Sequence, residues 1–199
     1  ALAIWDPAQS VMSFPAWDCL PYDRVSPNAE IASTRMAVLA HLANSETGDL
    51  VVLTTLNAVS QKVPARSVLK RSSFMLRKGE QVDVEALRGY LARMGFAQSP
   101  NVFEPGDFAL RGGLIDIFPP GQEHPVRLDF FGDVLDGIRR FDVETQRSAG
   151  MVDQIELSPV SEVVLDEQSI TRFRQNYRIE FGAAGSDDPL YEAISAGRK

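Results

Sequence analysis

A change in the spacing of apolar residues near residue 107 restricts the fold more than any other feature of this sequence. Before it, apolar residues recur with helical spacing or in solid runs, whereas from Phe108 to Phe141 they alternate with polar ones. Alternation predicts four short strands, at 108–111, 114–118, 126–131 and 134–141. The runs are separated by the turn signals Gly112-Gly113, Pro119-Pro120-Gly121 and Gly132-Asp133. The pattern is typical of a small antiparallel α+β domain, which we place at 69–160.

Helices are predicted on both sides of this alternating region. Asp83 can cap a helix that ends at Gly95, with one apolar face made of Val84, Leu87, Leu91 and Met94. Helical spacing returns from Asp166 to Phe181, where Ile170, Phe173 and Tyr177 share a face. We assign 161–199 as a helical segment. Residues 1–65 supply too few strands for a parallel sheet, and the chain stops soon after the helix-like pattern at 191–194, so we expect both ends to have been cut from a longer protein.

The first 68 residues predict a different layer. The run 51–55 (VVLTT), preceded by Gly48-Asp49, is typical of a strand that is buried on both faces, as in a parallel sheet. A helix is predicted to start at Ser26-Pro27 and to carry Ile31, Arg35, Val38, Leu39 and Leu42 on one face. The predicted fold class is therefore α/β, with a partial parallel domain at 1–68 interrupted by the antiparallel domain at 69–160.

Charge and composition exclude several classes of protein. The net charge is −7, and no third of the chain has more basic than acidic residues, so we expect no strong nucleic-acid binding by this chain. Cys19 is the only cysteine, which rules out an intrachain disulfide bond. No apolar run approaches the roughly 18 to 20 residues that cross a bilayer. We expect no membrane association and a cytoplasmic location.

The residues of common catalytic sites are missing or scattered. The phosphate-binding pattern G-x-x-x-x-G-K-[ST] does not occur, and His41, His124 and Cys19 do not form a zinc-site pattern. The run 163–167 (VVLDE) resembles a strand that ends in magnesium-binding and catalytic carboxylates, although Asp166 or Glu167 at a helix N-terminus explains it as well. We predict no catalytic, cofactor-binding or metal-binding residue, and no enzyme activity for this chain.

The predicted strand 126–131 has an unusual polar side. If Val126, Leu128 and Phe130 face the core, Phe131 lies outside with Arg127 and Asp129. Arginine and aromatic side chains on an exposed sheet face are typical of a protein-interaction site. In the alternative interpretation Phe131 tucks under the 132–133 turn, and the arginines form local ion pairs with Asp116 or Asp129.

Three segments carry a family resemblance: 108–119 (FALRGGLIDIFP), 126–133 (VRLDFFGD) and 141–148 (FDVETQRS). They resemble the domain that the excision-repair helicase UvrB shares with the transcription-repair coupling factors, the Mfd family. In both families this domain binds the damage-recognition protein UvrA. The resemblance implies UvrA-binding residues at Arg111, Arg127 and Phe131, on a docking surface at 108–148.

The segment 14–27 resembles the coupling factors, whereas UvrB has a longer, tyrosine-rich, DNA-clamping hairpin at this place. The resemblance implies part of a degenerate motor domain at 1–68, the UvrA-binding domain at 69–160, and a return into the first fold at 161–199. It further implies a non-catalytic module that recruits UvrA in transcription-coupled nucleotide excision repair. In the full-length protein, other parts use ATP and magnesium to move on double-stranded DNA and displace stalled RNA polymerase, and a C-terminal domain masks the UvrA-binding surface. The alternative is a fragment of a UvrB-type ATP-dependent DNA helicase.

Overall fold

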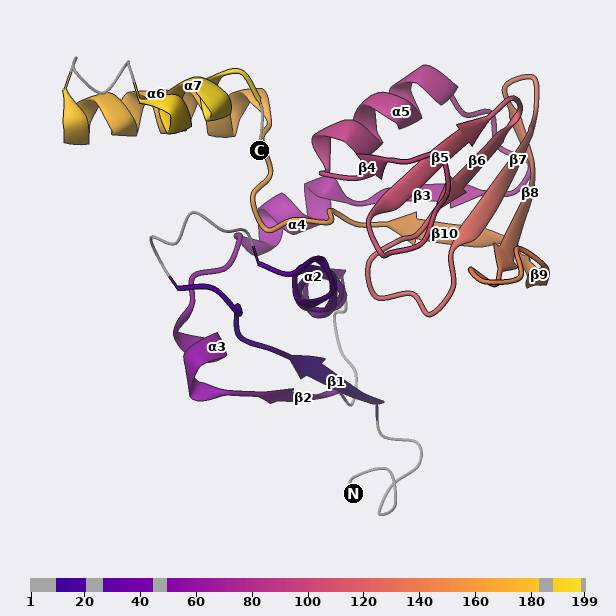
Figure 1. Cartoon of the computed structure of the whole chain (residues 1–199), viewed down its shortest axis with the longest axis horizontal. Helices are drawn as coiled ribbons and strands as arrows, with labels where there is room; N and C mark the ends of the chain where they lie inside the picture. The colour runs from indigo at the N-terminus through magenta and orange to yellow at the C-terminus, as the bar shows by residue number, and fades with distance from the viewer. Residues whose placement is uncertain (1–9, 21–26, 45–49, 183–187, 198–199) are drawn as a thin grey trace.

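The chain folds as a mixed α/β protein, which confirms the predicted class (Figure 1). The computed structural model describes residues 10–20, 27–44, 50–182 and 188–197. Within this part of the chain, no helix is both long and apolar enough to span a bilayer.

The N-terminal lobe consists of a short parallel sheet with helices around it. The strands β1 (Ser10–Phe14) and β2 (Leu50–Thr54) pair in parallel, with Ser10 opposite Leu50. The helices are α2 (Ala29–Asn44), α3 (Leu56–Ser60) and α4 (Arg66–Ser72), and α2 packs against β1 and α4. The buried apolar core of this lobe comprises Phe14, Met36, Val38, Leu39, Ala43, Ala58 and Leu69.

Two predictions for this lobe were wrong in detail. The strand near residue 51 is not buried on both faces: every residue of β2 is partly or largely exposed, and Leu53 is half exposed. The reason is that, among the described residues, this sheet has only β1 and β2. Helix α2 begins at Ala29 rather than at Pro27, and the Asn28 side chain accepts a hydrogen bond from the Glu30 amide. Residues 21–26, Gly48 and Asp49 lie outside the described part.

The second lobe is built on a six-stranded sheet with the order β4-β5-β6-β7-β8-β9. The central strands confirm the predicted ones: β5 (Asp107–Arg111), β6 (Leu114–Ile117), β7 (Val126–Phe131) and β8 (Val134–Phe141) pair antiparallel in sequence order. The edge strands β4 (Ala97–Gln98, parallel to β5) and β9 (Ser148–Val152, antiparallel to β8) were not predicted. A separate antiparallel pair joins β3 (Phe74–Arg77) to β10 (Gln154–Leu157).

Helix α5 (Val84–Arg93) covers one face of this sheet, and Asp83 caps it as predicted by accepting a hydrogen bond from the Ala86 amide. Leu87 and Leu91 of α5 share a core with inward-facing strand residues such as Ile115, Leu128 and Ile138. Among the residues that the structure describes, no helix covers the opposite face of the sheet (Figure 1). We call this opposite face the outer face.

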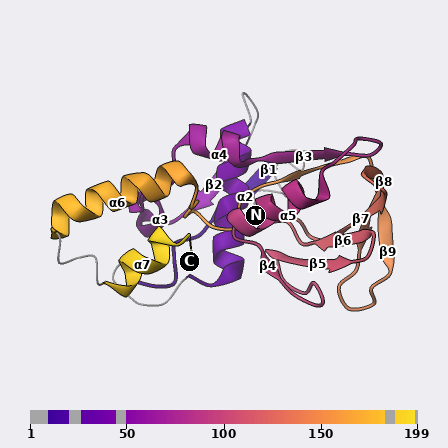
Figure 2. The same ribbon diagram turned by 90° about the horizontal axis from the view of Figure 1, so that it is seen from above.

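The chain continues into a helical hairpin of α6 (Glu167–Phe181) and α7 (Pro189–Ser195), which lie side by side in Figures 1 and 2. Tyr177 stacks against Phe173, Phe181 and the buried Tyr191. Asp166 caps α6 by accepting a hydrogen bond from the Ser169 amide at 2.7 Å, and residues 163–166 form no strand. The helix-terminus interpretation of this run is therefore confirmed, and its likeness to a magnesium-binding strand is not.

The two lobes meet where the 119–122 loop lies against α2. The Gly121 amide donates a hydrogen bond to the Ser33 hydroxyl at 3.3 Å. Arg35 of α2 forms a buried ion pair with Glu162, from the segment between β10 and α6. The lobes have separate apolar cores, while the domain boundaries at 68 and 160 stay predictions.

Candidate protein-interaction face

Strand register places the outward side chains of the outer face in rows. One row crosses four strands through Arg111, Leu114, Asp129 and Gly137, and the next runs through Asp116, Arg127, Arg139 and Met151. Phe131 and its partner Val134 lie one row beyond Asp129. Arg111, Arg127 and Phe131 therefore share one face of the sheet.

Arg127 is held by a buried carboxylate. Its Nε and Nη2 donate to the two carboxylate oxygens of Asp116 at 2.7 and 2.8 Å, and its guanidinium carbon lies 4.7 Å above the centre of the Phe141 ring. The Asp116 side chain is 1% exposed and that of Arg127 is 21% exposed. The hydrogen bonds to Asp116 raise the pKa of Arg127, while partial burial lowers it. The interpretation that the arginine forms a local ion pair is thus confirmed for Arg127. Its Nη1 donates no hydrogen bond to Asp116.

Arg111 lies at the end of β5 and is exposed. Its Nη2 donates to the Asn101 side-chain oxygen at 2.5 Å and to the Pro100 carbonyl at 3.1 Å. Both contacts tie the arginine to the loop before β5. They hold its guanidinium beside the Gly112-Gly113 turn without burying it.

Phe131 is 85% exposed, so the alternative in which it tucks under the following turn is wrong. Alternation along β7 keeps Val126 and Leu128 buried and directs Phe131 outward at the end of the strand. Gly132 follows with φ of 62°, which allows the chain to reverse into β8 directly after Phe131.

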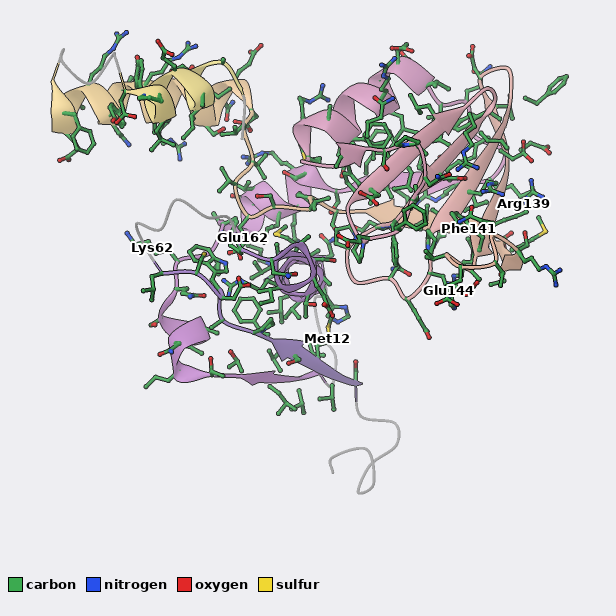
Figure 3. All side chains as sticks on the ribbon, in the orientation of Figure 1. Met12, Lys62, Arg139, Phe141, Glu144 and Glu162 are labelled. Atoms are coloured by element: carbon green, nitrogen blue, oxygen red, sulfur yellow. The ribbon has the colours of Figure 1, made fainter. Side chains whose placement is uncertain are left out.

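Only part of the outer face is open. Toward the far end of β8, Val102 and Val143 from two loops pack on Ala109, Phe118 and Phe141 to make a small third core. The open part carries Arg111, Phe131, Met151 and the pair of Arg139 with Asp129, whose side chains are 39% and 38% exposed. Figure 3 labels Arg139 and Phe141 on this sheet, well away from Glu162 beside the N-terminal lobe.

Comparison with known proteins identifies this sheet domain. Residues 74–163 match the UvrB interaction domain family. This stretch of the chain belongs to that family. The UvrB interaction domain spans β3 to β10, so it includes every residue of the outer face described above.

Nearly the whole chain is related to the transcription-repair coupling factors. It is 37% identical to the one of Haemophilus influenzae over 191 residues, which is 96% of this chain. It is also 37% identical to the one of Escherichia coli over 189 residues and 30% identical to the one of Staphylococcus aureus over 174 residues. The chain spans only about 16% of the first two relatives.

The open part of the outer face presents arginine N–H donors and one large exposed aromatic side chain, Phe131. Within the described residues, no three His, Cys, Asp or Glu side chains are grouped to hold a metal ion. A cleft of about 570 Å³ does lie between the lobes, with His41, Met75, Arg140 and Glu156 among its lining residues. Glu156 accepts a hydrogen bond from the Asn44 side chain at 2.6 Å in that lining.

Sequence reasoning missed two residues of the open surface, Arg139 and Met151. Arg139 falls in a predicted strand, but its outward direction depends on the extra residue Asp136 that shifts the β7–β8 register between Asp129 and Phe130. Met151 falls in β9, for which Ser148, Ala149 and Gly150 give almost no strand signal.

Proposed function

We propose that this chain is a docking module that recruits UvrA to damaged DNA through the open part of the outer face. The observation that carries the proposal is the large exposed aromatic ring of Phe131 on a UvrB interaction domain, with Arg111 and Arg127 on the same face. Aromatic and arginine side chains dominate the binding energy of protein interfaces.

The contacts we propose differ between the three residues. Phe131 fills an apolar pocket of UvrA, and Arg111 and Arg127 donate to carboxylates around it. Because Asp116 occupies Nε and Nη2 of Arg127, this arginine offers its Nη1 end rather than the whole side of the guanidinium. We infer that Asp116 and the Phe141 ring fix this donor in place before UvrA binds, which lowers the entropy lost on association.

The decisive experiment is a titration of UvrA with the wild-type chain and with Phe131→Ala. We expect at least about thirtyfold weaker binding, since losing a central anchor costs about 2 kcal/mol or more. A matched control is Ile179→Ala, because Ile179 is 78% exposed on α6, outside the UvrB interaction domain. Equal affinities for wild type and Phe131→Ala, with both proteins folded by circular dichroism, would overturn the proposal.

For the longer protein, we propose the activity of a transcription-repair coupling factor: ATP-driven displacement of stalled RNA polymerase on double-stranded DNA, in the cytoplasm. ATP and magnesium would be bound by parts outside this chain, and a C-terminal domain would mask the outer face until polymerase is engaged. A UvrB-type helicase is less well supported, because Asp166 caps a helix and the relatives reported above are coupling factors.

A further inference from the structure

The open part of the outer face extends beyond Phe131 to the edge of the sheet. We propose that UvrA also contacts Met151 of β9, as a second apolar anchor, and the Arg139–Asp129 pair that lies between the two anchors. This inference rests on the proposed function and adds two strands, β8 and β9, to the docking site.

The register makes Met151 part of the same surface as Arg127. Arg127 pairs with Arg139, and Arg139 pairs with Met151, so the three side chains form one row across neighbouring strands. With strands about 4.8 Å apart, Met151 lies roughly 10 Å from Arg127 across the sheet. Phe131 lies four residues from Arg127 along β7, or roughly 13 Å at 3.3 Å per residue. A partner patch of ordinary size, about 800 Å² per protein, covers both anchors.

Met151 is 66% exposed on an edge strand in which Ser148, Ala149 and Gly150 are also exposed and only Val152 packs against the core. Methionine is flexible and polarisable, and it adapts to irregular apolar surfaces when another protein covers it. The exposed side chain contributes nothing to the apolar core of its own sheet. Burial against a partner is therefore the contact in which it gains free energy.

Between the anchors lies a charged pair that is still available for contact. Arg139 Nη2 donates to Asp129 Oδ2 at 2.6 Å, and both side chains are more than one third exposed. A guanidinium has five N–H donors, so Arg139 can keep this bond and donate to a partner carboxylate as well. Gly137, opposite Asp129, has no side chain to block the approach.

The charges of the outer face indicate what kind of UvrA surface would bind it. The two central rows and Phe131 hold three arginines, Arg111, Arg127 and Arg139, against two aspartates, Asp116 and Asp129. They hold no lysine or glutamate, and the two aspartates, a residue type that is also depleted at interfaces, are each paired with an arginine. In a chain of net charge −7, this local positive excess favours an acidic surface of UvrA with an apolar depression at each end.

The test compares Met151→Asp with Met151→Leu in titrations against purified UvrA. We expect Met151→Asp to bind about tenfold more weakly or worse, and Met151→Leu to stay within about twofold of wild type, because leucine keeps the apolar volume. The control is Val163→Asp, an exposed position outside the outer face. Circular dichroism of each variant checks the fold.

The outcomes separate this inference from the proposed function. If Phe131→Ala loses UvrA and Met151→Asp binds like wild type, the extension is wrong and the docking function stands. If neither variant loses UvrA, the docking function itself fails. Should Met151→Asp misfold, a photo-crosslinking amino acid at position 151 replaces it: a UvrA adduct supports the contact, while no adduct, or only adducts between copies of this chain, overturns it.

Discussion

Arg35 and Glu162, 127 positions apart in the sequence, form a buried ion pair that joins α2 to the segment between β10 and α6. The arginine side chain is fully buried, and its guanidinium carbon lies 4.2 Å from the centre of the Phe14 ring. Trp17 adds a hydrogen bond from its indole Nε1 to the same Glu162 carboxylate at 2.9 Å. This cluster connects the N-terminal lobe to the end of the UvrB interaction domain.

Glu162→Ala is expected to lower the free energy of unfolding by about 3 kcal/mol or more, because it leaves the Arg35 charge buried without its carboxylate. Urea unfolding followed by tryptophan fluorescence and by circular dichroism measures the change. Glu80→Ala is the control, since the pair of Glu80 with Arg77 is about half exposed and should contribute less than about 1 kcal/mol. Similar losses in the two variants would show that the buried cluster does not stabilise the fold.

Arg127→Met should lower the free energy of unfolding by roughly 2 to 4 kcal/mol, because it leaves the buried Asp116 carboxylate without its arginine. The loss is smaller than for a fully buried pair, since Arg127 is partly exposed. Adding Asp116→Asn removes that charge, so the double variant should be more stable than Arg127→Met alone. Thermal and urea unfolding of the four proteins of this cycle check the prediction. It fails if Arg127→Met unfolds like wild type or if the second substitution lowers stability further.

For this sheet, the sequence predicted those features that depend on residues close together in the chain. Alternation over 126–131 predicted Phe131 outside, since the direction of a side chain in a strand follows from its neighbours, but burial under the 132–133 turn stayed open until the structure showed the ring exposed. The pairing of Arg127 with Asp116 was only one of two interpretations, because residues eleven positions apart meet through strand register. Arg35 was predicted to share a helix face with Ile31, Val38, Leu39 and Leu42, but nothing nearby in sequence indicates a partner as distant as Glu162.

The structure also shows why the weaker predictions failed. A solid apolar run normally indicates burial on both faces, yet β2 has a single neighbouring strand in the described part of the chain, and half of Leu53 remains exposed. Strands β3 and β10 are short and pair with one another across 77 residues or more, from Arg77 to Gln154, so neither has a local signal of its partner. Register and lobe packing are long-range properties that spacing alone does not reveal.

Gly121→Ala should loosen the junction between the lobes. A Cβ on Gly121 would lie 2.2 Å from the Ala37 Cβ, and the residue has φ of 72°. We expect a loss of about 2 kcal/mol or more from backbone strain together with steric overlap. Gly132→Ala is the matched control, because its φ of 62° imposes similar strain while no atom lies within 4 Å of the added Cβ. If Gly121→Ala lowers the free energy of unfolding no more than Gly132→Ala does, the close approach of Gly121 to α2 is contradicted.

The cap of α6 makes the stability of the helical hairpin depend on pH. The hydrogen bond from the Ser169 backbone amide holds the pKa of Asp166 below its ordinary value, with help from the Ser169 side chain. An aspartate in an unfolded chain titrates near 3.9, so the extra stabilisation is fully present above about pH 5 and is lost as the pH falls through the lower native pKa.

Asp166→Asn keeps a capping oxygen but cannot be charged, and it loses a few tenths of a kcal/mol of interaction with the helix dipole. At pH 6, amide hydrogen exchange in α6 should therefore be slower in wild type than in Asp166→Asn, whereas near pH 2 the two proteins should exchange alike. A difference that stays constant between these pH values would show that ionised Asp166 does not stabilise the helix.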